Sequence, residues 1–370
     1  MIAEGVSLAS IGGHRVLFHE ARQELYELDD GMAFVWNRLT EGTAIDRIAE
    51  EAAGRGLPEG QVRAWLDHAV SEWTRLGLLR PAALRQRLSI GGVRIEIRYA
   101  TAALAEFVAP GFSHLEAEDG PDGQDGWAAD CQLDLAEEDG ATVIRRGAAD
   151  LATCRRDEII PALRGALTLE AVGRGRHEVA LHAATVAAGG HALLLSGCPG
   201  AGKSTLAVAL AYSGLGLAGG LAGGLAGDDV ALLGADGRVT GLRFAPALKP
   251  GSWPLLAGMR PDLLDLPVHV RYDSQGVRFL DGVPAADDGP LPVRWIVSLD
   301  RRDGAEPALR PLDPLETLRD LIGGAASADD RLGTKAFHAL ARVLDGAGCH
   351  RLTYSRLDDA VALLAGLCGS

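Results

Sequence analysis

One short run of residues has the composition and spacing of a phosphate-binding loop. It follows the pattern GxxxxGK[ST] and reads Gly197, Cys198, Pro199, Gly200, Ala201, Gly202, Lys203, Ser204 and Thr205. Apolar segments precede it (192–196) and follow it (206–212), which is the strand–loop–helix setting that the pattern requires. There, backbone N–H groups and the helix N-terminus hold phosphate oxygens. Lys203 would neutralise the β- and γ-phosphates and the Ser204 hydroxyl would bind Mg²⁺. We therefore predict a site for ATP and Mg²⁺ at this phosphate loop (residues 197–205).

Other residues near the phosphate loop could act on a bound nucleotide. Asp228 and Asp229 stand directly before an apolar segment, 230–233. Adjacent carboxylates at a strand edge can divide two tasks, one binding the metal and the other taking the proton of a substrate hydroxyl. The alternative is a solvated acidic turn. His182 lies in an apolar segment that we interpret as a strand, where a packed core histidine is the usual reading.

The segment LHAATVAAGGHALLLSGCPGAGKST, followed by GDDVALL, resembles the catalytic domain of the HPr kinase/phosphorylase family. It is more similar still to relatives of that family in peptide-modification clusters. The step from His182 to Gly197 matches the family, whereas the step from Lys203 to Asp228 is longer. A tandem LAGG repeat over 217–228, which we interpret as a loop, accounts for the excess.

This resemblance implies a catalytic site made of His182, Lys203, Asp228 and Asp229. Asp229 would accept the proton of the substrate hydroxyl, His182 would orient or stabilise the transferred phosphoryl group, and Ser204 and Asp228 would bind the metal. The family's downstream metal-binding Glu has no equivalent here, since the matching region reads RFAPALKPGS from residue 243. Arg243 and Lys249 are the candidate anion contacts in that region, with ordinary surface charges as the alternative. Family members are oligomers, so a homo-oligomer is implied as well.

The N-terminal region is predicted to be a separate α+β unit. Three short β-like segments (7–11, 15–19 and 24–28) precede three helical patterns, the second capped by Thr43 and the third opened by Pro58. Three strands followed by three helices is a small winged-helix arrangement.

This region resembles the PqqD family, which captures the leader peptides of ribosomally made, modified peptides. The resemblance rests on YELDDGMAFVWNRL at 26–39, on 43–49 and on LGLL at 76–79. It implies that a leader peptide adds a strand beside Glu24, Leu25, Tyr26, Glu27 and Leu28 and packs on the third helix. DNA binding is the rival use of a winged helix, but acidic residues outnumber basic ones over 1–90, so no basic footprint exists. A purely structural cap is the other alternative.

Composition limits the class of protein. The chain has 370 residues and a net charge of −14, which argues against nucleic acid or an anionic membrane as the main partner. Its 5 Cys are scattered without a CxxC pair, so neither disulfides nor a zinc site are expected. Residues 206–227 carry no charge, but we interpret them as a soluble helix plus a glycine-rich loop rather than a membrane span. With no signal peptide seen, we expect a cytoplasmic protein.

The remaining elements predict an α/β fold. We expect one strand at 89–99, a hairpin at 132–135 and 141–145, a helix at 157–171, a strand at 293–299, helices at 314–322 and 334–344, then a strand at 351–354 and a helix at 358–367. The predicted regions are a PqqD-like winged-helix peptide-recognition domain (1–85), a β-rich N-terminal part of the kinase region (86–177) and an HPr-kinase-like, PEPCK-like P-loop catalytic domain (178–370).

Together the two resemblances imply an ATP-dependent kinase. Its substrate would be a Ser/Thr-type hydroxyl of a ribosomally made precursor peptide, delivered through its leader by the N-terminal domain. Two alternatives stay open at this point. One is a nucleotide-gated peptide-binding chaperone without transfer chemistry, and the other is a kinase for a small hydroxy amino acid.

Overall fold

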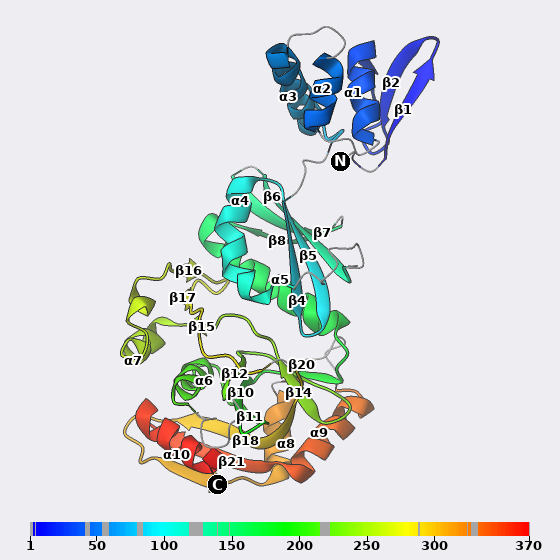
Figure 1. Cartoon of the computed structure of the whole chain (residues 1–370). Helices are drawn as coiled ribbons and strands as arrows, with labels where there is room; N and C mark the ends of the chain where they lie inside the picture. Colours follow the sequence, from blue (N-terminus) through cyan, green and yellow to red (C-terminus); the bar gives the residue numbers. More distant parts are fainter. Residues whose placement is uncertain are drawn as a thin grey trace. The chain divides into compact units, whose positions relative to one another are not determined.

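The computed structural model divides the chain into two compact units, Met1–Leu84 and Arg85–Ser370 (Figure 1). It describes residues 3, 5–40, 45–53, 59–79, 84–117, 129–138, 140–147, 149–214, 223–287, 289–323, 325–326 and 332–369. The predicted caps Thr43 and Pro58 and the first part of the LAGG repeat therefore lie outside the described residues.

The first unit has three strands followed by three helices, as predicted. They are β1 (Val6–Ile11), β2 (His14–His19), β3 (Glu24–Leu28), α1 (Asp30–Thr40), α2 (Ile45–Ala53) and α3 (Glu59–Arg75). The strands form an antiparallel sheet in the order β1-β2-β3. The core of the unit is built around Trp36, whose ring meets that of Trp73 edge to face with centroids 5.2 Å apart. Such aromatic pairs add to the stabilisation that burial alone provides.

The second unit begins with a five-stranded sheet. Its strands, in spatial order, are β4 (Leu84–Ile90), β5 (Val93–Tyr99), β6 (Cys131–Glu138), β7 (Ala141–Arg146) and β8 (Ala149–Cys154). Helical segments accompany it: α4 (Ala102–Val108), η1 (Ala109–Leu115), η2 (Arg156–Glu158) and α5 (Ile159–Arg174). The hairpin and the helix predicted in this region are confirmed.

The single strand predicted at 89–99 is wrong, because the chain turns at Gly91-Gly92 between β4 and β5. Both glycines have positive φ, 58° and 82°. A Cβ at Gly91 would lie 2.8 Å from Leu232 Cδ1, so a larger residue would also clash. Apolar residues alternate on both sides of the turn, but the alternation shifts by one residue between Ile90 and Val93. The Gly91-Gly92 pair is itself a turn signal.

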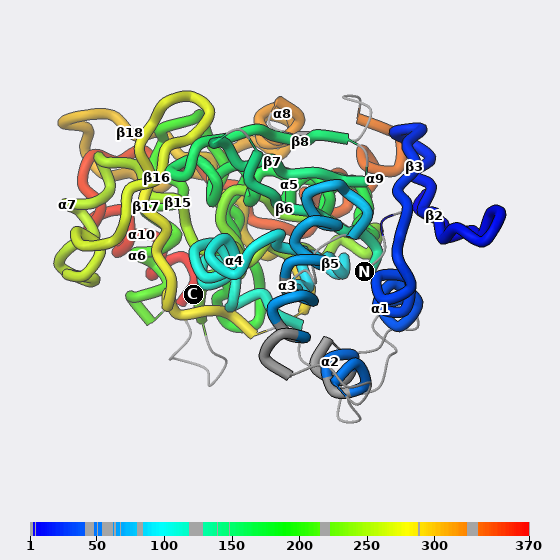
Figure 2. Tube along the Cα trace, turned by 90° about the horizontal axis from the view of Figure 1, so that it is seen from above, coloured from blue at the N-terminus to red at the C-terminus, as the bar shows by residue number. Residues whose placement is uncertain are grey.

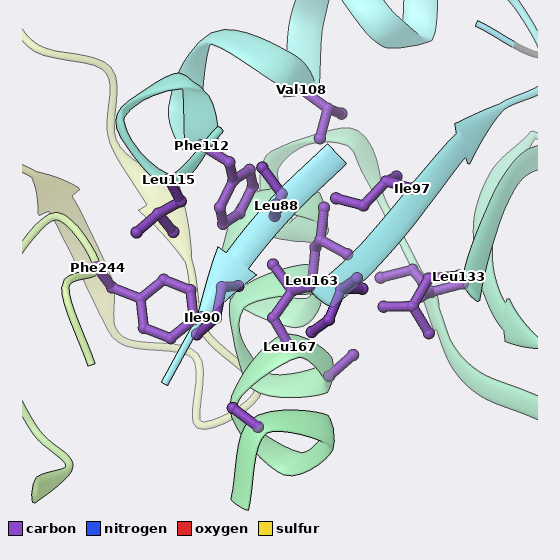
Figure 3. Close-up of a cluster of buried hydrophobic side chains, with 14 of the residues drawn as sticks. Leu88, Ile90, Ile97, Val108, Phe112, Leu115, Leu133, Leu163, Leu167 and Phe244 are labelled. Atoms are coloured by element: carbon purple, nitrogen blue, oxygen red, sulfur yellow. The ribbon is translucent and has the colours of Figure 1, made fainter. Parts of the chain in front are cut away.

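One hydrophobic core connects this first sheet to the rest of the second unit. Figure 3 shows Leu88, Ile97, Leu163 and Leu167 gathered between the strands and α5, with Phe244 entering from a much later segment. Leu232 and Leu242 belong to the same cluster. Because these side chains share one core, residues on both sides of position 177 fold as one compact unit.

The second unit also contains a ten-stranded mixed sheet, in the order β12-β10-β11-β18-β14-β13-β9-β20, with β21 beside β18 and β19 beside β21. The bounds are β9 (Val179–Leu181), β10 (Ala184–Ala188), β11 (His191–Ser196), β12 (Gly224–Gly227), β13 (Ala231–Leu233), β14 (Arg238–Gly241), β18 (Leu291–Arg301), β19 (Ala308–Pro311), β20 (Ala325–Ala326) and β21 (Gly348–Tyr354). Strand β18 runs parallel to both β11 and β21.

Helices cover both faces of this sheet. Leu193 and Leu195 of β11 pack with α6 (Lys203–Tyr212) and α10 (Leu357–Gly369). Leu194 packs on the other side with α8 (Pro314–Gly323) and α9 (Thr334–Gly346). The strands predicted at 293–299 and 351–354 and the C-terminal helices are confirmed. The fold is thus mixed α/β and is compatible with a phosphate-loop domain.

Two features of the uncharged run 206–227 are now explained. Helix α6 is apolar on all sides because it is buried on all sides, between the sheet and a second cluster that includes Leu248 and Leu256. The prediction of a loop is wrong for the end of the LAGG repeat, which forms strand β12 and pairs with β10. A Cβ at Gly224 would lie 2.5 Å from the backbone of Ala285, so close backbone approach requires glycine there. Among the described residues, no helix is both long enough and apolar enough to cross a membrane.

A small lobe completes the unit. It contains β15 (Ala247–Leu248), β16 (His269–Val270), β17 (Gly276–Phe279), η3 (Pro250–Ser252), α7 (Trp253–Leu256) and η4 (Pro261–Leu264). The three strands pair in the order β15-β17-β16. They lie beside α7 in both views (Figures 1 and 2).

Candidate functional site

The phosphate loop lies where three parallel strands end. β11 leads directly into it, and the C-terminal ends of β18 and β21 stand at the same edge of the sheet. Gly197 has φ 141°, and a Cβ there would lie 2.9 Å from the carbonyl oxygen of Leu299 on β18. The first glycine of the motif is therefore required by the neighbouring strand as well as by the turn.

The third glycine of the motif is constrained by a tyrosine. Gly202 has φ 92°, and a Cβ there would lie 2.5 Å from the Tyr354 hydroxyl. That hydroxyl donates a hydrogen bond to the Ala201 carbonyl (2.7 Å), which fixes the loop against the end of β21. Gly202 is also the N-cap of α6, so the helix N-terminus begins inside the loop. A helix N-terminus with free N–H groups favours bound anions.

Lys203 is buried, and its ammonium group folds back onto the loop. Nζ donates to the Gly197 carbonyl at 2.8 Å. Burial lowers the pKa of Lys203, while the nearby Asp229 and Asp228 carboxylates oppose that change. Thr205, the last residue of the motif, shares a 2.6 Å hydrogen bond with Ser252 of η3. The phosphate loop is thus connected to the small lobe.

A cavity of about 1490 Å³ opens over the phosphate loop. Its lining includes the loop residues Pro199, Gly200, Gly202, Lys203, Ser204 and Thr205, and it also includes the predicted site residues His182, Asp228, Asp229 and Lys249. Gly197, Cys198 and Ala201 are not among the lining residues. Arg243 is exposed and does not line the cavity, so its predicted contact with an anion finds no support there.

Asp228 is buried, with 2% of its side chain exposed. Oδ2 accepts a hydrogen bond from the Ala247 amide (3.2 Å) and lies 3.6 Å from Nη2 of Arg164. Burial raises the pKa of Asp228, whereas Arg164, the Ser204 hydroxyl and the Ala247 amide lower it. Among the residues that the structure describes, Oδ1 has no hydrogen-bond partner. A buried carboxylate oxygen without a partner is costly unless a cation or donor binds it.

These features fit a divalent cation. The unpartnered oxygen of Asp228 and the Ser204 hydroxyl are hard oxygen ligands of the kind that Mg²⁺ prefers. Within the described ranges, no three His, Cys, Asp or Glu side chains come together as a ready metal site. Mg²⁺ is often bound through one or two carboxylates only, with substrate phosphates and water completing its shell. Asp228 and Ser204 are therefore the residues that could hold it here.

Asp229 is half-exposed and has a backbone conformation that is rare for a residue with a side chain. Its φ is 78°, in the left-handed region. Oδ1 lies 3.1 Å from Nδ1 of His182. Desolvation raises the pKa of Asp229, but the His182 hydrogen bond and the charges of Arg164 and Lys203 outweigh it and bring the pKa to about 2. Asp229 is therefore a carboxylate at neutral pH.

The sequence predicts a strand at His182, but His182 lies in the break between β9 and β10. With 41% of its side chain exposed, it is not a packed core histidine. The apolar residues on both sides conceal this break in the sequence, since they form two short buried strands. The bend turns the imidazole towards Asp229.

Arg164 was not predicted as a site residue. It projects from α5 into the cavity and keeps only 11% of its side chain exposed. Nη1 donates to the Ala245 carbonyl at 2.7 Å, and the guanidinium lies over the rings of Phe244 (5.2 Å) and Phe279 (5.7 Å). The sequence offers only one hint of its role, which is that it is a charged residue among apolar ones in the helix predicted at 157–171.

Comparisons with known proteins are limited in extent. A family model described as "Magnesium chelatase, subunit ChlI" matches residues 169–213, a stretch that includes β9, β10, β11, the phosphate loop and α6. No curated protein matches the chain. A solved structure titled "TbiB1 in Complex with the TbiA(beta) Leader Peptide" is similar over 22% of this chain and 98% of that chain, at 23% identity and a TM-score of 0.21. A TM-score of 0.21 is too low to show that the two folds are alike.

The predicted peptide-binding strand, β3, is an edge strand of the first unit's sheet. Leu25 is 66% exposed while Leu28 is buried, so the strand offers one apolar side chain to solvent. Glu24 accepts a hydrogen bond from the Tyr26 hydroxyl, and Glu27 pairs with His14. An edge strand has backbone groups available for pairing with another chain.

Proposed function

We propose that this protein is an ATP-dependent kinase that phosphorylates a hydroxyl of a ribosomally made precursor peptide. The observation that carries the proposal is the Asp229–His182 pair, which lines the same cavity as Lys203 and the phosphate loop. A nucleotide site alone would need only the loop. A carboxylate held by an imidazole beside the loop supplies what transfer to a hydroxyl also needs, namely a group that orients the nucleophile and takes its proton.

The proposed step is an in-line displacement. The hydroxyl oxygen of the acceptor forms a bond to the γ-phosphorus as the bond to the bridging oxygen breaks, which releases ADP. The proton of the hydroxyl passes to Asp229. With a pKa of about 2, Asp229 is a weak base, but in a loose transition state the hydroxyl keeps its proton until late in the step. Asp229 therefore mainly aims the hydroxyl and receives its proton at the end.

The other residues have separate tasks. Lys203 places its positive charge against the transferred phosphate, and the α6 N-terminus holds the phosphate oxygens. His182 fixes the orientation of Asp229 through Nδ1. Mg²⁺, bound through Asp228 and Ser204, would neutralise charge on the phosphate oxygens.

The first unit is proposed to recruit the peptide by its leader. Edge strand β3, with the exposed Leu25, supports this role, because an extended peptide can add a strand to such an edge. Tethering raises the local concentration of the linked acceptor segment to about the millimolar range, so the cavity needs little affinity of its own.

Asp229→Asn tests the kinase proposal against the rival binding module. The amide keeps the shape of the side chain but cannot accept the proton, so we expect phosphoryl transfer to be lost while ATP affinity, measured by isothermal calorimetry, is retained. Asp345→Asn is the matched control, since Asp345 is exposed on α9 and does not line the cavity. Unchanged activity in Asp229→Asn would overturn the assignment of Asp229 and favour the binding module.

A further inference from the structure

The cavity over the phosphate loop is larger than a nucleotide needs. Its volume is about 1490 Å³, whereas pockets that hold one ligand of small-molecule size are roughly 300–1,000 Å³. The phosphate loop and the carboxylates line one part of it. Other elements, chiefly α5, α7 and the turn between β16 and β17, line the remainder. There is room for a second ligand beside the nucleotide.

Helix α5 contributes a continuous face to this second part. Ala162, Gly165, Thr168 and Leu169 all line the cavity, and their spacing of three and four residues places them along one side of the helix. The first three have small side chains. Gly165 is exposed, and a Cβ there would meet nothing within 4 Å. This face therefore forms an open floor along which an extended chain can lie.

Large, exposed apolar side chains line the same cavity. Leu169 of α5 is 73% exposed, Leu255 of α7 is 44% exposed and Tyr272 is 93% exposed, and all three line the cavity. Tyr272 belongs to the turn that the Arg271 amide closes by donating to the Gln275 carbonyl at 3.0 Å. Exposed apolar side chains that line one cavity together are a sign of a binding site, whereas single exposed apolar residues are common on any protein surface.

Two of the arginines that line the cavity already lie close to carboxylates. Arg271 lies 3.5 Å from Asp273, and Arg164 is engaged by Asp228. These two guanidinium groups are therefore engaged, while an apolar side chain would find Leu169, Leu255 and Tyr272 in the same cavity.

We propose that this second part of the cavity, the acceptor groove (Ala162, Gly165, Thr168, Leu169, Leu255 and Tyr272), binds an extended peptide that carries a bulky apolar residue close to the phosphorylated hydroxyl. The inference rests on the proposed function and names the class of its substrate. It does not require the first unit or a leader.

The position of the apolar residue follows from α5. Arg164 marks the catalytic end of the groove, since it lies 3.6 Å from Asp228. Leu169 is farther along the same helix by roughly 7.5 Å, at 1.5 Å per residue. An extended peptide rises about 3.3 Å per residue. Because the two side chains leave the helix roughly 140° apart, this rise is a minimum separation, and the apolar residue is expected about two or more positions from the hydroxyl residue.

The test uses the full-length protein, ATP, Mg²⁺ and a synthetic peptide library with one fixed Ser and degenerate flanking positions. Phosphorylated peptides should be enriched in bulky apolar residues about two or more positions from Ser. The Gly165→Leu side chain fills the floor of the groove, where the peptide would lie. The peptide then loses its apolar contact with the groove, so KM for the best library peptide should rise by roughly tenfold or more. ATP affinity should not change, because the phosphate loop is untouched.

Gly173→Leu is the matched control. Gly173 is on the same helix, is also exposed and has open space around its Cβ position among the described residues, but it does not line the cavity. Leucine favours a helix over glycine by up to about 1 kcal/mol, so neither variant should unfold α5. Peptide KM should be unchanged in Gly173→Leu.

The outcomes separate this inference from the proposed function. Phosphorylation without any flanking preference, or an unchanged KM in Gly165→Leu, would overturn the acceptor groove and leave the kinase standing. If no library peptide is phosphorylated although ATP binds, the acceptor groove falls, because it is proposed to act without a leader. The peptide kinase falls only if precursor peptides that carry their leader are not phosphorylated either.

Discussion

Replacing Arg164 by methionine should destabilise the second unit through Asp228. Methionine keeps much of the length of the side chain and its contact with Phe244 and Phe279, but it removes the positive charge. Nη2 of Arg164 lies 3.6 Å from the buried Oδ2 of Asp228. At an effective dielectric constant near 20, two charges at about that distance attract by roughly 4–5 kcal/mol. Loss of one partner from a buried pair typically costs about 3–5 kcal/mol.

The cost should depend on pH with a definite sign. Burial raises the pKa of Asp228 above its ordinary value of 3.8, and removal of Arg164 raises it further. A raised pKa means that the folded protein holds the proton of Asp228 more tightly than the unfolded chain does. The stability that this proton contributes is complete below the pKa of Asp228 in the unfolded chain, and it is lost as the pH rises through the pKa of Asp228 in the folded protein. The Arg164→Met variant should therefore differ most from wild type at high pH and approach it as pH falls.

Urea unfolding followed by far-UV circular dichroism, at about pH 8 and about pH 5, measures this dependence. Adding Asp228→Asn to Arg164→Met removes the unpaired charge and should recover most of the lost stability. Arg302→Met is the control, because Arg302 pairs with Asp300 while 69% exposed and should cost less than about 1 kcal/mol. An equal loss at both pH values, not rescued by Asp228→Asn, would show that Arg164 acts only by packing.

Three further predictions concern the loop, the catalytic pair and the first unit. Gly202→Ala should weaken ATP binding about 5–30-fold, because a Cβ there adds left-handed backbone strain of about 1–2 kcal/mol and clashes with the Tyr354 hydroxyl. Adding Tyr354→Phe removes that hydroxyl and should recover part of the lost ATP affinity. No recovery would contradict the contact between Gly202 and Tyr354. His182→Ala should raise the pKa of Asp229 from about 2, so the stability that its ionised form contributes above 3.8 is lost at a higher pH on acidification; an unchanged acid-unfolding midpoint would count against the pair. Trp36→Ala should cost the first unit about 3–5 kcal/mol, and calorimetry should find ATP affinity unchanged if the two units are independent.

The phosphate loop could be predicted from sequence because everything that defines it is local. Its glycines, Lys203 and Ser204, and the apolar segments around them lie within one short stretch. The structure adds reasons that are not local: Gly197 is required by Leu299 and Gly202 by Tyr354. These contacts come from strands that follow much later in the chain.

Arg164 shows where prediction from sequence ends. Its place beside Asp228 depends on a shared core that brings α5 next to the segment around Phe244. No spacing within the sequence encodes that contact. The break at His182 is hidden for a different reason, since the apolar residues on both sides of it form two short buried strands. The turn at Gly91-Gly92 does have a local signal, namely the glycine pair and a one-residue shift in the alternation of apolar residues, so the sequence could have predicted it.

The most direct test of the central claim is intact-mass spectrometry of candidate precursor peptides, meaning any short peptide encoded beside the gene for this protein, after incubation with the full-length chain, ATP and Mg²⁺. We expect one peptide to gain a single phosphoryl group, and we expect Lys203→Ala and Asp229→Asn to abolish the gain. A peptide that binds the protein but never changes in mass would contradict the kinase and identify a binding module instead.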